Sequence, residues 1–358
     1  MTFHTFELST TLSGRQFQQI NKDFKAYKSK YFSDNAVSNR KIFITLKDNG
    51  ILIYLHRRLI DDMSFIYTIV YKLNPLRMFD SDNYVGLFHS NDTYKIPERM
   101  NELLRSISQH LPLFHECCLT RFDFCANIIL ENRNQVTEYI RLLNQSFVPC
   151  EKYKQKMIYD SRSGRYNYPI EEATFTHANY VEVSIYNKNQ QLTSEKLKHN
   201  LHSEILRCEI RCQKQYINML KRKFMVNSTE EFLYSLPEIG SYVFNRQLKS
   251  LQLANSYFEH KNISDYIEHS SLKNKTKQKL INFSRHAAIH RGIQNAVERE
   301  IVTNVKSILK KFSDLGICAM PLPYRSDIKS GTNLLDLCLQ YADIKNIEEP
   351  LEGNNILC

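Results

Sequence analysis

Three short segments of the sequence carry charged or phenolic side chains at every second position. They are "TRFDFC" at 120–125, "YVEVSIYNK" at 180–188 and "LRCEIRC" at 206–212. Successive side chains of a β-strand alternate between its two faces, so each segment predicts a strand with one polar face and one apolar face. The polar set comprises Arg121, Asp123, Glu182, Ser184, Tyr186, Lys188, Arg207, Glu209 and Arg211. If the strands are neighbours, one sheet face gathers all of these groups.

That combination suits the chemistry of a phosphodiester. Carboxylates bind a hard divalent cation such as Mg²⁺ or Mn²⁺, and arginines stabilise charge on the phosphate. A tyrosine hydroxyl can attack phosphorus and form a covalent intermediate. The same alternation also describes an ordinary wet antiparallel face on which arginines pair with carboxylates, and this is the commoner reason for such a pattern.

The candidate nucleophile is Tyr186, and Tyr180 is its nearest competitor. An ordinary sheet tyrosine is the alternative, because the chain has 21 tyrosines. Two residues further on, Lys188 could favour the phenolate or neutralise the phosphate. A solvated strand end would explain this lysine equally well.

Asp123 and Glu209 are the candidate metal ligands. Each lies centrally in its strand between apolar neighbours, where an unpaired carboxylate would be costly. The alternative is an ion pair with an arginine of the same face, and the sequence offers Arg121, Arg207 and Arg211. Glu182 would complete the ligand set, and His177 and Asn127 are further candidates for the same position.

Composition restricts the classes of protein and partner. The chain has 358 residues and a formal charge of +10, which favours polyanionic partners, with nucleic acid ahead of a membrane surface. Its nine cysteines form no CxxC pair, so we expect reduced thiols, with Cys208 and Cys212 as core residues. No segment has the length and apolar character of a signal peptide or membrane span, and we expect a cytoplasmic protein.

Periodicity predicts two structural regions. Alternating or apolar runs dominate residues 1–220 with a few helices between them, which predicts an α+β domain built on a largely antiparallel sheet with flanking helices. From 221 to 330 we expect an all-helical domain, with helices over 228–248, 262–272, 275–292 and 293–316. A tail follows at 331–358. Ser228 and Glu231 predict a capping box, and Gly316 a helix end.

The order of motifs resembles rolling-circle replication initiators, both those of filamentous phages and those of Gram-positive plasmids with their related conjugative relaxases. The similarity is carried by "LTRFDFCANI", then "MIYDSRSGRYNY", then "YVEVSIYNKNQQL" and "EILRCEIRC". With "KLNPLRMFDSDNYVGLF" before them and "LGICAMPLP" after them, which resemble segments of the phage-type branch, it covers residues 70–320 in the family's order. The chain departs from the family pattern at Asp160, where a glycine is expected, and at Asn127 and Gln190, where acidic residues are expected. It also lacks a clean His-hydrophobe-His segment.

The resemblance implies an α+β nuclease domain that nicks one strand of a replication origin. Tyr186 would form a 5′-phosphotyrosine link, with Mg²⁺ or Mn²⁺ bound by Asp123, Glu209 and Glu182. Religation would reverse the transfer at termination. The resemblance also implies a host helicase as partner, and a homodimer is compatible with it. A conjugative relaxase would use the same chemistry on a transfer origin.

Basic residues predict where DNA binds. Arg162 lies in "SRSGR", whose small polar residues would let a phosphate approach, although a plain turn is the alternative. In the helical region, the candidate DNA-binding residues are Lys273, Lys275, Lys277, Lys279, Arg285 and Arg291. Residues 271–311 carry ten Lys or Arg against two Glu, which favours duplex binding over a merely solvated face. Arg121, Arg207 and Arg211 would contact the opened strand. A regulator that binds DNA without cutting it is the rival prediction.

Overall fold

The computed structural model describes most of the chain. The described residues are 1–27, 32–35, 41–46, 49–60, 64–80, 82–147, 153–160, 165–167, 169–177, 180–197, 203–299 and 304–343. Arg162 lies outside them, as does the end of the expected tail.

The chain forms two compact units, and both are discontinuous in sequence. The first comprises residues 1–125 and 211–239, and the second comprises 126–210 and 240–358. The boundary therefore differs from the one that periodicity suggests near residue 220. The reason is that two long strands, β7 (Cys118–Leu130) and β13 (Glu204–Gln213), each run from one unit into the other.

The fold is α+β, and its main sheet has eleven strands in the order β2-β3-β4-β5-β1-β7-β13-β12-β11-β8, with β6 paired to β1. Every pair whose register is described is antiparallel. The other strands of the sheet are β1 (Thr2–Leu12), β2 (Phe32–Asn35), β3 (Lys41–Leu46), β4 (Ile51–Leu59), β5 (Phe65–Leu73), β6 (Phe88–His89), β8 (Tyr153–Gln155), β11 (Glu172–His177) and β12 (Val181–Asn187). A separate hairpin joins β9 (Ile158–Asp160) and β10 (Arg165–Asn167). The three polar strands are neighbours in this sheet, in the order β7-β13-β12, which meets the condition stated for a shared polar face.

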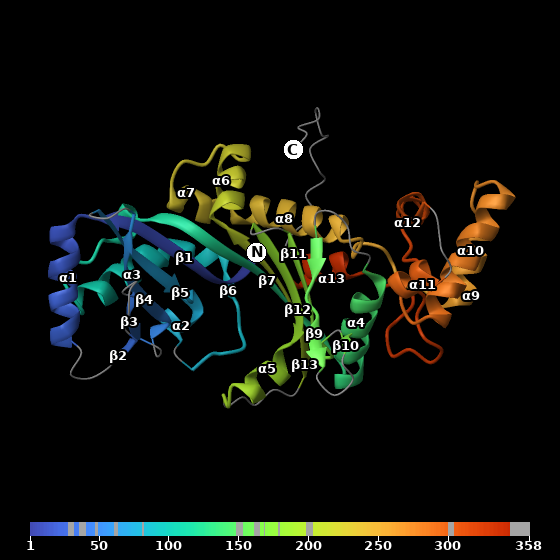
Figure 1. The fold of residues 1–358 in the computed structure, drawn as a ribbon, viewed down its shortest axis with the longest axis horizontal. Coiled ribbons are helices and arrows are strands. Elements are labelled where there is room, and N and C mark those ends of the chain that lie inside the picture. The colour runs from blue at the N-terminus through green and yellow to red at the C-terminus, as the bar shows by residue number, and fades with distance from the viewer. Residues whose placement is uncertain are drawn as a thin grey trace. The chain divides into compact units, whose positions relative to one another are not determined.

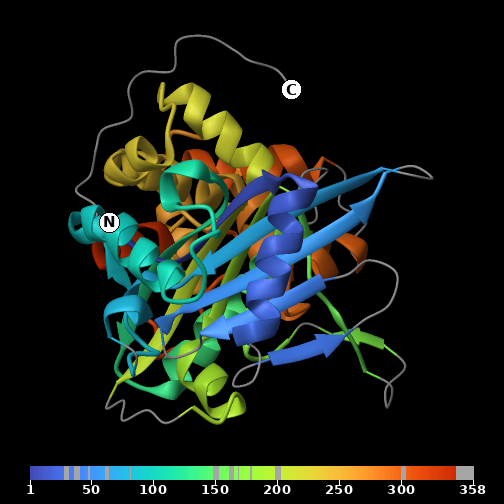
Figure 2. The same ribbon diagram turned by 90° about the vertical axis from the view of Figure 1, so that its left-hand side faces the viewer.

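Alternation explains the core of the first unit. On β7, Phe122 and Phe124 are completely buried, and Phe122 lies against Phe6 of β1 and Phe232 of α7 (Thr229–Tyr234). Helix α1 (Gly14–Tyr27) covers the strands of this unit in Figure 2, and its Phe17 ring contacts Tyr67 of β5 at 4.5 Å between centroids. The remaining helices of the unit are α2 (Pro75–Phe79), α3 (Ile96–Arg105) and α6 (Lys214–Lys223).

In the second unit, α4 (Arg133–Ser146) packs on β11 and β12, and α5 (Lys188–Ser194) follows β12 directly (Figure 1). The helical region contains α8 (Leu236–Ser250), which begins in the first unit, and α9 (His260–Glu268), α10 (Asn274–Ile289), α11 (Ile293–Arg299), α12 (Val305–Asp314) and α13 (Leu334–Tyr341). None of the helices in the described part of the chain has both the length and the apolar character needed to cross a membrane.

Two of the predicted helices are each two helices. Residues 228–248 divide into α7 and α8 at Ser235, next to Pro237 in the first turn of α8, and proline is favoured only at a helix start. Residues 293–316 divide into α11 and α12, and Asn304, the N-cap of α12, has the left-handed φ of 69° that interrupts a helix. The caps behave as expected: Ser228 Oγ accepts from the Glu231 amide, and Gly316 has a φ of 70° after α12.

Candidate active site

Asp123 lies in a closed network of charges in the first unit. Its side chain is completely buried. Arg121 Nε donates to Asp123 Oδ1 at 2.9 Å, and Arg121 Nη2 and Thr5 Oγ1 both donate to Oδ2. Arg211 Nε lies 3.5 Å from Asp123 Oδ1, and Arg121 also binds Glu7 Oε1 at 2.7 Å. Two guanidinium groups and a hydroxyl thus surround this carboxylate.

The alternation of β1 explains why that network forms. Glu7 is the cross-strand partner of Arg121, and Thr5 lies on the same face of β1 two residues earlier. The segment "TFELS" has the same polar alternation as the three segments above, so this signal could have drawn attention to Thr5 and Glu7 from the sequence. A buried carboxylate is tolerated only with such compensation, which makes the network a structural feature of the sheet.

Tyr186 has a different partner in the second unit. Its phenol donates a hydrogen bond to Glu209 Oε2 at 3.2 Å. Glu209 is 5% exposed, whereas Tyr186 is half-buried. On its other side, Tyr186 is the cross-strand partner of Glu172, which is ion-paired with Lys156. A partly accessible hydroxyl next to a nearly buried carboxylate is an arrangement from which a proton can be transferred.

Other predicted residues of the polar face lie further along β12. Glu182 is four residues before Tyr186, or about 13 Å along a strand. It contacts Ser184 Oγ, which lies 3.5 Å from Glu182 Oε1, and Ser184 in turn accepts from Thr174 at 3.3 Å. Glu182 and Glu209 therefore do not converge at the Tyr186 hydroxyl. The competitor Tyr180 is 39% exposed, just before β12.

Lys188 does not continue the strand. Strand β12 ends at Asn187, whose side chain caps α5, and Lys188 is the first residue of that helix. Its side chain is 4% exposed, and its Nζ donates to Gln191 Oε1 at 2.9 Å. The strand alternation that predicts Lys188 on the same face as Tyr186 ends at Asn187, one residue before Lys188. The sequence pattern therefore does not predict where the Lys188 side chain points.

The arginines of the polar face are engaged inside the protein. Arg207 is completely buried and donates from Nε to Asn127 Oδ1 at 2.7 Å, which leaves it no surface for a DNA phosphate in this structure. Arg121 and Arg211 face Asp123, as described above. In the helical region, by contrast, Lys273, Lys275 and Lys279 are exposed on or just before α10.

Two further predicted residues of this region, Arg285 and Arg291, are also exposed. Arg285 donates to Asn282 Oδ1 at 3.1 Å on α10. Arg291 follows the helix with a left-handed φ of 54°. Of the predicted DNA contacts, therefore, those of the helical region are accessible and those of the sheet are largely enclosed.

The expected oxygen-only site for Mg²⁺ or Mn²⁺ does not fit these positions. The two oxygens of Asp123 already face guanidinium groups, and Glu182 lies too far along β12. One possible metal-binding group occurs among the described residues, namely His4, Cys125 and Glu209, whose ligand atoms lie within 4.8 Å of one another. Cys125 ends one compact unit and Glu209 belongs to the other, so the group carries no metal assignment.

Comparisons with known proteins add little. No family model matches the chain, and no curated protein matches it. One match among solved structures is the di-domain ARO/CYC StfQ from the steffimycin biosynthetic pathway, at 6% identity and a TM-score of 0.21, covering 70% of this chain and 94% of that one. A likeness at that level carries no argument about fold or activity.

Proposed function

We propose that the protein nicks and religates one strand of DNA through a covalent link to Tyr186, as a rolling-circle replication initiator. The observation that carries this proposal is the hydrogen bond from the Tyr186 hydroxyl to Glu209. A neutral phenol is a weak nucleophile, and a carboxylate that already accepts its proton is the simplest general base for it. The resemblance of the ordered sequence motifs to these initiators supports the same role for Tyr186.

The proposed transfer balances in atoms and charge. The Tyr186 oxygen bonds to the scissile phosphorus as its proton passes to Glu209, and the bond between phosphorus and the 3′ oxygen breaks. The 3′ oxygen takes a proton from water and leaves as a hydroxyl that can prime synthesis, Glu209 releases the tyrosine proton to solvent, and the 5′ phosphate stays on the tyrosine. Religation is the reverse transfer, and it needs no nucleotide because the energy of the phosphodiester is retained.

The proposal includes Mg²⁺ or Mn²⁺ only as a cation on which strand cleavage is expected to depend. When bound, such a cation would stabilise charge on the phosphate. The host helicase, the homodimer and the cytoplasmic location implied at the sequence level remain parts of the same proposal. A conjugative relaxase would share every step written above.

The rival is a regulator that binds DNA without cutting it. Two observations favour it: Asp123 is fully compensated by arginines, and Glu209 has only 5% of its surface exposed. It predicts tight DNA binding with no covalent product, and no effect of the change Tyr186→Phe on binding or on DNA topology.

The deciding experiment incubates the protein with Mn²⁺ and supercoiled DNA that carries its own replicon. Relaxed circles and a protein-linked 5′ end are expected for the natural sequence and for Tyr180→Phe, and neither product is expected for Tyr186→Phe. Tyr180→Phe is the matched control because it also removes a hydroxyl beside β12. An adduct that survives in Tyr186→Phe would mean that another residue is the nucleophile. Tight binding without any adduct would mean that the protein is the regulator.

A further inference from the structure

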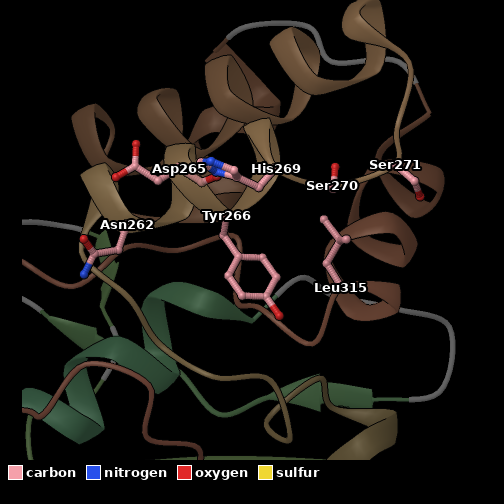
Figure 3. A pocket seen from close by; sticks show the side chains of 7 residues that line it. All are labelled: Asn262, Asp265, Tyr266, His269, Ser270, Ser271 and Leu315. Carbon is pink, nitrogen blue, oxygen red and sulfur yellow. The ribbon is translucent and has the colours of Figure 1, made fainter.

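A pocket of about 620 Å³ opens in the helical region of the second unit (Figure 3). One face of α9 forms much of its lining, because Asn262, Asp265, Tyr266 and His269 are spaced three, four and seven residues apart. Leu315, from the turn after α12, also lines it. No part of the proposed transfer at Tyr186 uses these residues.

Tyr266 offers this pocket a flat aromatic surface. Its side chain is 50% exposed, and its ring stacks on Phe258 with centroids 5.9 Å apart and planes at 29°. The contact with Phe258 holds the ring in place while half of its surface stays accessible. In Figure 3 the ring extends from α9 into the region that Leu315 also borders. A second flat ring can therefore stack there at little cost in side-chain entropy.

The polar groups of the pocket suit the edge of a heterocycle. His269 Nδ1 lies 2.7 Å from the carbonyl oxygen of Asp265, and a hydrogen bond there needs the proton on Nδ1. The Nε2 atom of the neutral ring is then an acceptor. The Asp265 carboxylate adds a second acceptor, and the Asn262 amide can donate or accept. Such groups recognise the amino and carbonyl groups of a nucleobase rather than plain hydrocarbon.

The next helix, α10, carries several basic side chains. Residues 274–289 of α10 contain Lys275, Lys277, Lys279 and Arg285 and no acidic residue, and Lys273 precedes the helix. Lys277 Nζ donates to the carbonyl oxygen of Glu268 at 2.6 Å, which ties the start of α10 to the end of α9. Lys275 and Lys279 are exposed and lie four residues apart on one face of α10, and Lys273 is exposed at its N-cap. Several such cations match a chain of phosphates better than a single phosphate.

We propose that this pocket binds one unstacked base of a single-stranded DNA segment, with the base on Tyr266 and the adjoining phosphates along α10. Stacking of bases on aromatic side chains combined with a cationic track is the general mode of single-strand binding. The inference rests on the proposed function in taking DNA as the partner. It does not require Tyr186 to be the nucleophile.

The test measures binding of a short fluorescent oligothymidylate to the full chain by anisotropy. Tyr266→Ala should weaken binding about tenfold or more, whereas Tyr266→Phe should keep it, because the phenyl ring preserves the stacking surface. Tyr234→Ala is the matched control, since Tyr234 is also an exposed tyrosine, at 67% against 50% for Tyr266, and lies on α7 of the other unit. Circular dichroism of each variant verifies that the helices remain folded. Unchanged affinity in a folded Tyr266→Ala would overturn the proposal.

A second arm distinguishes a DNA strand from a free nucleotide. Thymidine monophosphate should compete poorly with the oligonucleotide, because it lacks the phosphates that α10 would bind. If thymidine monophosphate competes as strongly as the oligonucleotide, the ligand of the pocket is a mononucleotide and not a DNA strand. In salt titrations Lys275→Ala should reduce the slope of log affinity against log salt by about 0.7, the value for one phosphate contact on a single strand. An unchanged slope would remove α10 from the site.

Failure of the two proposals can be told apart. Tyr186→Phe should lose the covalent adduct and keep oligothymidylate binding, whereas Tyr266→Ala should weaken binding and still form the adduct at saturating DNA. A protein that binds the oligonucleotide through Tyr266 but never forms an adduct keeps the pocket and loses the nicking activity. If the protein forms the adduct and Tyr266→Ala binds the oligonucleotide as tightly as the natural sequence, the nicking proposal stands and the pocket proposal is rejected.

Discussion

Asp123 and Glu209 both occupy the centre of a strand between apolar neighbours, yet their partners differ. Asp123, in the first unit, faces two arginines and a threonine hydroxyl. Glu209, in the second unit, accepts the phenolic hydrogen of Tyr186. Both carboxylates are almost fully removed from solvent, with 0% and 5% of their surface exposed. The two carboxylates have the same alternating sequence context, and they differ in the groups that donate hydrogen bonds to them.

The difference has a chemical consequence. A carboxylate between guanidinium groups accepts hydrogen bonds from cations that stay charged, so these neighbours give it no proton. A carboxylate that accepts from a phenol shares a proton that can move when the phenol attacks an electrophile. The Asp123 network thus stabilises the sheet, while the pair formed by Tyr186 and Glu209 is suited to transfer chemistry.

The largest effect expected from this contrast is on stability. Asp123→Asn would remove the carboxylate that Arg211 faces and would leave Arg121 paired with Glu7 alone. Breaking a buried pair from one side costs about 3–5 kcal/mol of unfolding free energy. Glu209→Gln is the matched change, and we expect a loss of about 1.5–3 kcal/mol, the value for a hydrogen bond to a charged group. Urea denaturation of both variants measures the difference. Equal losses would mean that the two carboxylates play the same structural part.

The next effect is on catalysis. Glu209→Gln should slow strand cleavage about a hundredfold, the lower end of what a general base contributes, while the protein stays folded. Glu172→Gln is its control, because Glu172 lies across from Tyr186 on β11 and is ion-paired with Lys156 on the accessible side of the sheet. The rate of adduct formation under single-turnover conditions measures both. A similar loss in the two variants would assign the effect to general charge near Tyr186 rather than to proton transfer.

Much of this arrangement could be predicted from strand alternation. The buried ring face of β7 and the core positions of Cys208 and Cys212 follow from a period of two. The adjacency of β7, β13 and β12 does not follow from it, and it enters the sequence prediction only as a condition. Alternation fixes the face of a side chain but not the residue across from it. Whether Asp123 meets a metal or an arginine depends on the register with β1 and β13, which a single sequence does not encode locally.

Element ends set the other limit. Lys188 belongs to a helix because Asn187 caps it, so the strand period fails one residue before the lysine. The pocket beside Tyr266 depends on Leu315 from the far end of α12, some fifty residues away in sequence, and no local pattern brings them together. Both features come from tertiary packing rather than from periodicity.

The smallest effect concerns the thiols beside the two carboxylates. Burial, and then the Asp123 charge, raise the pKa of Cys212 well above its usual value. For Cys208 the hydrogen bond with Cys338 and burial come first, and the Glu209 charge raises its pKa further. A thiol pKa raised on folding adds stability that is present below the ordinary thiol pKa of about 8.5 and is lost as the pH rises through the folded value.

Alkylation with iodoacetamide between neutral and alkaline pH, read by mass spectrometry of each peptide, tests this assignment. Exposed Cys118 should react first, and both buried thiols should be protected. Asp123→Asn should move the reaction of Cys212 to lower pH without moving that of Cys208, and Glu209→Gln should do the opposite, because the Asp123 charge raises the pKa of Cys212 and the Glu209 charge raises that of Cys208. If Asp123→Asn exposes both thiols equally, its effect is loss of the fold. A shift confined to Cys212 separates the charge of Asp123 from its structural role.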